Sequence, residues 1–144
     1  MARTDKFREQ HKELLALAGE LEKLLDVRAL TADGRPARST LGRLMGKLVL
    51  HLGVEDQVLY PELTRSKDAR VADMARRFAK EMESTSKAVV AYSQKWSSGP
   101  LISEKPDDFV RETRAVLRTL GDRIRRENEQ LYAAADRQAE PTPA

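Results

Sequence analysis

The stretch that decides the fold is HLGVEDQVLYP, residues 51–61. His51 and Glu55 are four residues apart, so in an α-helix their side chains lie on one face, about one turn from each other. Leu48 and Val58 continue this face at the three-residue spacing of an amphipathic helix. The pattern therefore predicts a helix that turns a histidine and a glutamate toward the same interior as its apolar side chains.

Similar spacing recurs along most of the chain. Four segments show it, residues 4–26, 39–65, 68–96 and 103–137. Stretches with glycine and proline, residues 30–36 and 97–100, predict a loop and a break between helices. Pro61 is expected to end or kink the second helix, because proline lacks the N–H that the helix ladder needs. No alternating β-branched run indicates a strand. We predict an all-α fold, an up-down-up-down antiparallel four-helix bundle over residues 1–138 with a disordered tail at 139–144.

Four glycines fall inside the predicted helices, Gly19, Gly46, Gly53 and Gly121. A glycine in a helix interior costs about 1 kcal/mol relative to alanine. We therefore expect these glycines to permit a close approach between neighbouring helices.

The composition narrows the classes of function. The chain has 144 residues, of which 40% are hydrophobic and 34% charged, as in one soluble domain. No apolar run approaches the roughly 20 residues that span a bilayer. The absence of cysteine excludes disulfides, thiolate metal sites and cysteine nucleophiles. A net charge of +3 with 5% aromatic residues does not favour a nucleic-acid partner. We expect a cytoplasmic protein that binds neither nucleic acid nor membrane.

The candidate functional residues are the polar exceptions on the apolar faces. His11 and His51 are the two histidines of the chain, and both fall on inner faces. Glu55 and Glu127 also fall on inner faces, and a buried carboxylate is costly unless it is paired, hydrogen-bonded or bound to a metal. Imidazole and carboxylate together are common ligands of zinc, manganese and non-haem iron. A lone histidine on such a face is more often a hydrogen-bonded core residue, so the spacing alone leaves both readings open.

An internal repeat links the second and fourth helices. Residues 51–60 read HLGVEDQVLY, and residues 123–132 read RIRRENEQLY. A glutamate, a polar neighbour and a Leu-Tyr pair recur in register, and Arg123 stands where the first copy has histidine. The repeat suggests two helical hairpins of common design. Tyr60 and Tyr132 could place their hydroxyls near the site or cap the bundle, and we expect capping, because large aromatic residues at helical spacing usually belong to the core.

These residues resemble the hemerythrin-like, HHE cation-binding family, and the resemblance covers most of the chain. The resemblance rests on an early histidine, a long loop and the signature His-x-x-x-Glu-(Asp/Glu)-x-x-Leu-Tyr-Pro, here residues 51–61. The resemblance implies a four-helix bundle that holds non-haem iron. By position it assigns His11 and His51 to one iron, Glu55 to a first bridging carboxylate and Glu127 to a second, with Asn128 as the other candidate for that role.

Departures from the family pattern leave three arrangements open. No histidine remains for a second iron, because residues 80–83 read KEME in the third helix and Arg123 stands in the fourth. One metal ion, iron or else zinc or manganese, would use the four candidate ligands. A second ion would need carboxylates such as Glu81 or Glu83. Without any metal, Arg123 would pair with Glu55 or Glu127, unless it extends outward beside Ile124.

The leading prediction is a non-catalytic domain that uses one non-haem iron to sense or bind oxygen, nitric oxide or redox state. Its partners would be the metal ion and a small diatomic ligand. A protein partner or a second copy in a homodimer would detect the resulting shift of the helices. The alternative is a metal-free bundle that binds proteins or small molecules. An oxidoreductase ranks last, because no separate acid–base pair is evident.

Overall fold

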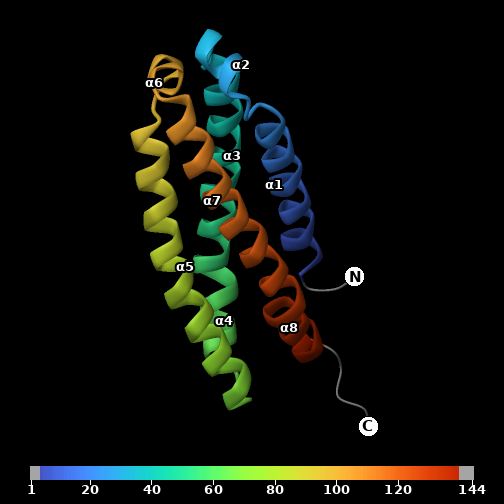
Figure 1. Ribbon diagram of the computed structural model, residues 1–144. Helices are drawn as coiled ribbons and strands as arrows, with labels where there is room; N and C mark the ends of the chain where they lie inside the picture. Colours follow the sequence, from blue (N-terminus) through green and yellow to red (C-terminus); the bar gives the residue numbers. More distant parts are fainter. Residues whose placement is uncertain (1–3, 140–144) are drawn as a thin grey trace.

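The computed structural model describes residues 4–139, and every regular element within that range is helical, which confirms the all-α prediction. Figure 1 shows long helices lying side by side, with both termini toward the same end. The long columns are α1 (Asp5–Lys23), α3 (Arg35–Val54) continued by η1 (Glu55–Leu59) and α4 (Tyr60–Thr64), α5 (Ala69–Lys95), and α7 (Pro106–Arg126) continued by η2 (Glu127–Leu131) and α8 (Tyr132–Ala139). The predicted tail at 139–144 lies outside the described residues, apart from Ala139 itself.

Two short helices occupy the regions predicted as a loop and a break. They are α2 (Val27–Ala32) and α6 (Gly99–Glu104), which pack against each other at one end of the molecule. Asp26 and Ser98 cap them, because each side chain accepts a hydrogen bond from the backbone N–H three residues later. Each helix buries one aliphatic residue, Leu30 and Ile102. The side-chain caps and the one buried aliphatic residue in each segment thus stabilise short helices in these connections.

The second column continues through Pro61 because its turns widen just before the proline. Residues 55–59 form the π-helical segment η1, in which the N–H of Tyr60 donates to the carbonyl of Glu55, five residues earlier. This extra residue per turn rotates the following side chains. Leu59 and Tyr60 are therefore both buried, whereas Val58 is exposed. The inward position predicted for Val58 was wrong, because a uniform helical period does not anticipate the π-helical turn.

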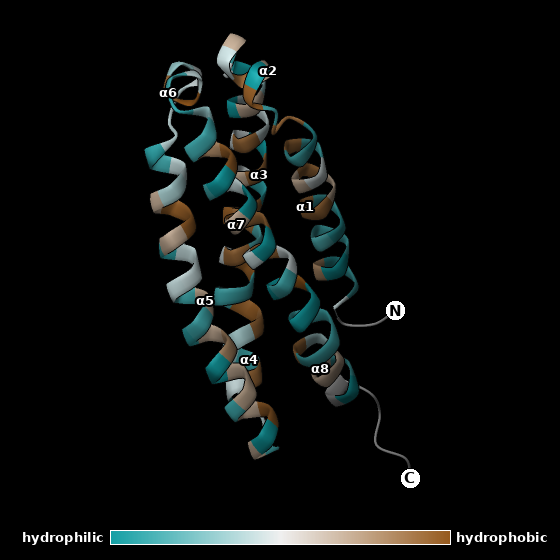
Figure 2. Ribbon diagram, in the orientation of Figure 1, coloured by the Kyte–Doolittle hydropathy of each residue, from teal (hydrophilic) through white to brown (hydrophobic). Residues whose placement is uncertain are grey.

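The apolar core is divided into two clusters, one toward the α2 and α6 end and one toward the α4 and α8 end. The first includes Leu14, Leu21, Leu44, Leu48, Phe109 and Leu120. The second includes Leu59, Leu63, Phe78, Leu131 and Ala135. Figure 2 shows the amphipathic character of the long helices, each with hydrophobic (brown) and hydrophilic (teal) residues. Among the described residues, no helix is both long and apolar enough to cross a membrane.

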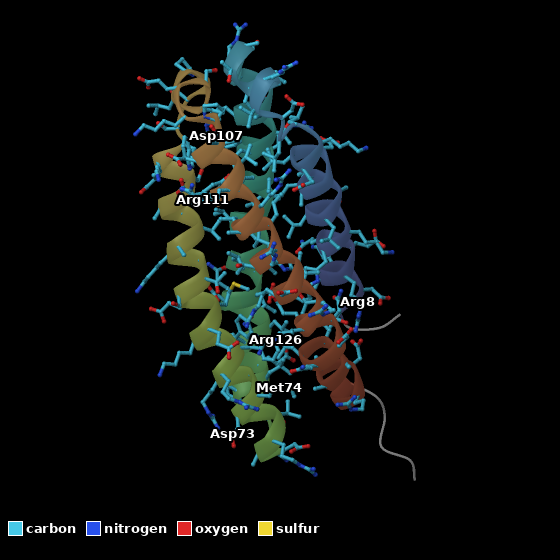
Figure 3. The ribbon with its side chains drawn as sticks, in the orientation of Figure 1. Arg8, Asp73, Met74, Asp107, Arg111 and Arg126 are labelled. Carbon is cyan, nitrogen blue, oxygen red and sulfur yellow. The ribbon has the colours of Figure 1, made fainter. Side chains whose placement is uncertain are left out.

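The start of α1 is fastened to α8. Thr4 stands at the N-cap position of α1, but its hydroxyl donates to the carboxylate of Asp136, at 2.9 Å from Oδ1. The backbone N–H of Thr4 donates to the same oxygen. Arg8, labelled in Figure 3, lies 3.4 Å from Asp136 Oδ2 and donates to the backbone carbonyl of Asn128. These bonds fix α1 against the chain's last helix one turn before His11.

The glycines that permit close approach are not those expected. A Cβ built on Gly19, Gly46, Gly53 or Gly121 meets no atom within 4 Å outside its own helix, so the prediction of tight packing at these positions was wrong. The close contact lies where α6 meets the start of α3. There, a Cβ on Gly34 would stand 2.3 Å from the carbonyl oxygen of Gly99.

This difference predicts opposite effects for the same substitution. Gly46→Ala should raise the free energy of unfolding by about 0.5–1 kcal/mol, because alanine restricts the unfolded chain and fits the helix. Gly34→Ala should lower it, because the new methyl group would collide with backbone. Urea unfolding followed by circular dichroism measures both. Equal stability of the two variants would contradict the contact between α6 and α3.

Candidate metal centre

Between the two apolar clusters lies a group of four buried polar side chains. His11 comes from α1, His51 from α3, Glu55 from η1 and Glu127 from η2. Each offers one donor atom, and these four atoms all lie within 4.8 Å of one another. Donors on opposite sides of an ion with bonds of about 2.1 Å would be about 4.2 Å apart. The four predicted residues thus converge at the spacing of a coordination shell.

Two amides fix the orientation of the imidazoles. The side-chain oxygen of Asn128 lies 2.9 Å from Nδ1 of His11, and that of Gln10 lies 2.6 Å from Nδ1 of His51. Each Nδ1 therefore carries the proton and donates it to an amide oxygen, which leaves the lone pair on Nε2. Burial lowers the pKa of both histidines, so the rings are neutral. Neutral rings held from behind are the form in which histidine binds a metal.

The two carboxylates lack the hydrogen bonds that burial normally demands. Both oxygens of Glu55 and Oε2 of Glu127 are buried without a hydrogen-bond donor among the described residues. Oε1 of Glu55 makes a very close contact with Nε2 of His51, lone pair toward lone pair, an arrangement that a cation or proton between them would stabilise. Burial raises the pKa of Glu55. The pKa of Glu127 is raised well above its usual range, mainly by burial and in second place by the nearby Glu55. These orphaned oxygens fit a metal ion.

The two π-helical segments deliver these carboxylates. Each segment begins with a glutamate, Glu55 in η1 and Glu127 in η2, and each is followed by a tyrosine whose N–H donates to that glutamate's carbonyl. The repeat seen in the sequence is thus a repeated local structure. Wide turns of this kind occur frequently at functional sites.

Tyr132 contacts the centre, contrary to the prediction that it only packs at the end of the bundle. Its hydroxyl lies 3.1 Å from Nε2 of His11 and 3.5 Å from Nε2 of His51. Burial and the two nearby carboxylates raise the pKa of Tyr132, so the phenol keeps its proton and donates it to His11. Tyr60 is buried as well, and its hydroxyl has no hydrogen-bond partner among residues 4–139. The Leu-Tyr repeat was visible in the sequence, but the rotation caused by the π-helical turn was not.

The third-helix carboxylates lie apart from the four donors. Glu81 binds Arg123, with 2.8 Å between Oε2 and Nη1, and Glu83 is exposed and pairs with Lys87 at 3.3 Å. Arg123 is buried, and Ile124 is buried beside it, so the outward placement of Arg123 is wrong. Its Nε lies 3.7 Å from Oε1 of Glu127.

Comparison with known proteins agrees with this geometry. Residues 2–135 match the family model of the hemerythrin HHE cation-binding domain. No curated protein and no solved structure matches the chain.

The amide that holds His11 should influence metal affinity without being a ligand. Asn128→Leu removes the acceptor for Nδ1, so the ring loses its fixed tautomer, and metal affinity should fall about 10- to 100-fold. Glu129→Gln, at the next and exposed position of η2, is the matched control. Both are measured by competition with a chelator of known affinity. Equal affinity for the two variants would exclude this role of Asn128.

The centre also predicts how metal binding depends on pH. Because the pKa values of Glu55 and Glu127 are raised, the metal-free centre retains protons that a metal must displace. The apparent affinity should therefore decrease as the pH is lowered, whereas His11 and His51, with lowered pKa values, add little competition near neutrality. Calorimetry in buffers of different ionisation enthalpy counts the released protons. Binding without proton release would contradict the prediction.

Proposed function

Since this chain belongs to the hemerythrin HHE cation-binding domain family, we propose that it holds one non-haem iron in its core and uses it to bind or sense oxygen, nitric oxide or redox state. The proposed ligands are His11, His51, Glu55 and Glu127. The proposed architecture is the up-down-up-down four-helix bundle, in which the long columns alternate in direction along the chain.

The observation that carries this proposal is the convergence of four buried donors whose own hydrogen bonds are incomplete. Two neutral imidazoles and two carboxylates suit Fe(II), and also Mn(II) or Zn(II). The two negative charges of Glu55 and Glu127 match the two positive charges of a divalent ion. When bound, iron would supply redox chemistry and affinity for small diatomic molecules.

The same ligand set gives a route from the ion to the protein surface. The ligands come from α1, from the α3–η1 column and from η2, so a change in the ion's charge or coordination number would shift these elements together. A protein partner or a second copy of the chain could detect this shift. The protein's chemistry is thus binding and response rather than turnover, and a cytoplasmic location is part of this proposal.

A surface groove supports access for a small ligand. The groove has a volume of about 690 Å³ and is lined by residues of α3, η1, α4 and α5, including Leu52, Tyr60 and Met82. Tyr60 lies at the start of α4, directly after η1, which provides Glu55. The groove therefore leads solvent to the tyrosine beside the proposed ligands.

Metal content tests the proposal directly. Protein reconstituted anaerobically with Fe(II) and then desalted should contain about one iron per chain by elemental analysis, as four donors plus water require. His51→Ala should lose this iron while the circular dichroism spectrum stays helical. Asp56→Ala is the matched control, because Asp56 belongs to the same motif but is exposed.

The alternative function is a metal-free bundle that binds proteins or small molecules. It is favoured by Arg123, whose guanidinium already stands 3.7 Å from Glu127. In that case neither iron nor zinc nor manganese would be retained, and a chelator would leave the thermal unfolding midpoint unchanged. Retention of metal that is lost in His51→Ala would exclude it.

A further inference from the structure

A buried cation of the protein itself stands beside the proposed metal centre. Arg123, on α7, is the only buried lysine or arginine among residues 4–137. A guanidinium withdrawn from water needs strong compensation, since an unpaired buried charge is very costly. Arg123 lies one helical turn before Glu127, so its role must be sought in the core and not at the solvent-exposed surface.

Four contacts hold this guanidinium in one orientation. Nη1 lies 2.8 Å from Oε2 of Glu81, and Nη2 donates a hydrogen bond to the carbonyl oxygen of Phe78. The guanidinium carbon also lies 4.4 Å from the centroid of the Phe78 ring. On the inner side, Nε faces Oε1 of Glu127 at 3.7 Å and has no hydrogen-bond partner among the described residues. The cation is thus anchored on α5 and directed at a proposed ligand.

This contact divides the two oxygens of Glu127. Oε1 lies beside Arg123, whereas Oε2 is buried and receives no hydrogen bond from the residues that the structure describes. A carboxylate that bridges two metal ions needs one oxygen for each ion. Arg123 already stands next to one of them, so Glu127 has one oxygen left for a metal.

The balance of charge leads to the same number of ions. Glu55 and Glu127 together neutralise one divalent ion, and Glu81 neutralises Arg123. A second divalent ion would leave two uncompensated positive charges in and around the core, where low dielectric makes them costly. The charges of Glu55, Glu127, Glu81 and Arg123 therefore cancel with one divalent ion and leave a positive excess with two.

We propose that Arg123 is the residue that limits this centre to a single divalent cation, its guanidinium occupying the place beside Oε1 of Glu127 that a second ion would need. The inference rests on the proposed function. It makes Arg123 a specificity-determining residue that acts through Glu127 and is not itself a ligand.

The surroundings of Arg123 leave room for a metal ion if a substitution removes the guanidinium. A pocket of about 400 Å³ on its outer side is lined by Glu81, Thr85, Thr119, Asp122 and Arg126, among others. A shorter side chain at position 123 would open a path from this pocket toward Glu127. Glu81 would then keep its contact with Arg126, at 3.1 Å, but would be released from Arg123 and become available as a further ligand.

The test is the number of ions bound by the full chain before and after this exchange. Wild-type protein should bind about one Mn(II) or Zn(II), and Arg123→His, which replaces the cation by a neutral donor, should bind about two. Arg126→His is the matched control. Arg126 also contacts Glu81, at 3.1 Å, but it is 42% exposed and packs over the Phe78 ring on the outer side, so its variant should remain at about one ion. Paired Mn(II) ions also give a spin-coupled electron paramagnetic resonance spectrum, which an altered fold alone would not produce.

The outcomes separate the two proposals. If wild-type protein binds no ion, the proposed function fails. If wild-type protein binds two ions, or if folded Arg123→His stays at one, the role of Arg123 is refuted while the metal centre stands. Should Arg123→His not fold, Arg123→Gln removes the charge with a smaller change, and its failure to admit a second ion would refute the same role. Arg123→Lys, which keeps the charge, should stay at one ion.

Discussion

The burial of two carboxylates in one helical core is the constraint on which the rest of the structure depends. Glu55 and Glu127 are 0% and 1% exposed, burial raises the pKa of both carboxyl groups, and three of their four oxygens lack a hydrogen-bond donor among the described residues. Folding a metal-free chain around this pair is unfavourable unless protons or a cation compensate. The surrounding side chains compensate only in part, because the histidines are neutral and Arg123 alone brings a positive charge to the edge of the pair.

The π-helical segments reconcile this polar centre with continuous apolar packing. In an uninterrupted α-helix the inward positions after a buried glutamate lie three and four residues later, which would be Val58 and Leu59 after Glu55. In η1 and η2 the extra residue per turn brings both the leucine and the following tyrosine inward. The leucines join the second apolar cluster, and the hydroxyl of Tyr132 returns to the two imidazoles. One local distortion, used twice, thus closes the centre on its α4 and α8 side.

The sequence was sufficient for the long helices and for the four polar residues that gather in the core, but not for the features that depend on tertiary contacts. Polar residues on apolar faces identified His11, His51, Glu55 and Glu127, because such exceptions are rare and costly. The inward rotation of Tyr132 and the outward position of Val58 follow from π-helical turns, which no regular periodicity encodes. The contact of Gly34 with Gly99 joins residues far apart in the chain, so spacing within one helix could not reveal it. The same holds for Gln10 and Asn128, whose roles depend on which imidazole they face.

With a metal ion bound as proposed, the centre would combine two cations with different properties. Arg123 is covalently part of α7, so its guanidinium cation stays with the protein. A metal ion can leave, change its charge or bind a further ligand. Because the fixed cation stands at Glu127 and the two histidines come from α1 and α3, the variable part of the charge lies toward the histidines. Any response to a signal should therefore move α1 and α3 more than α5, which Phe78 and Glu81 hold against the fixed cation.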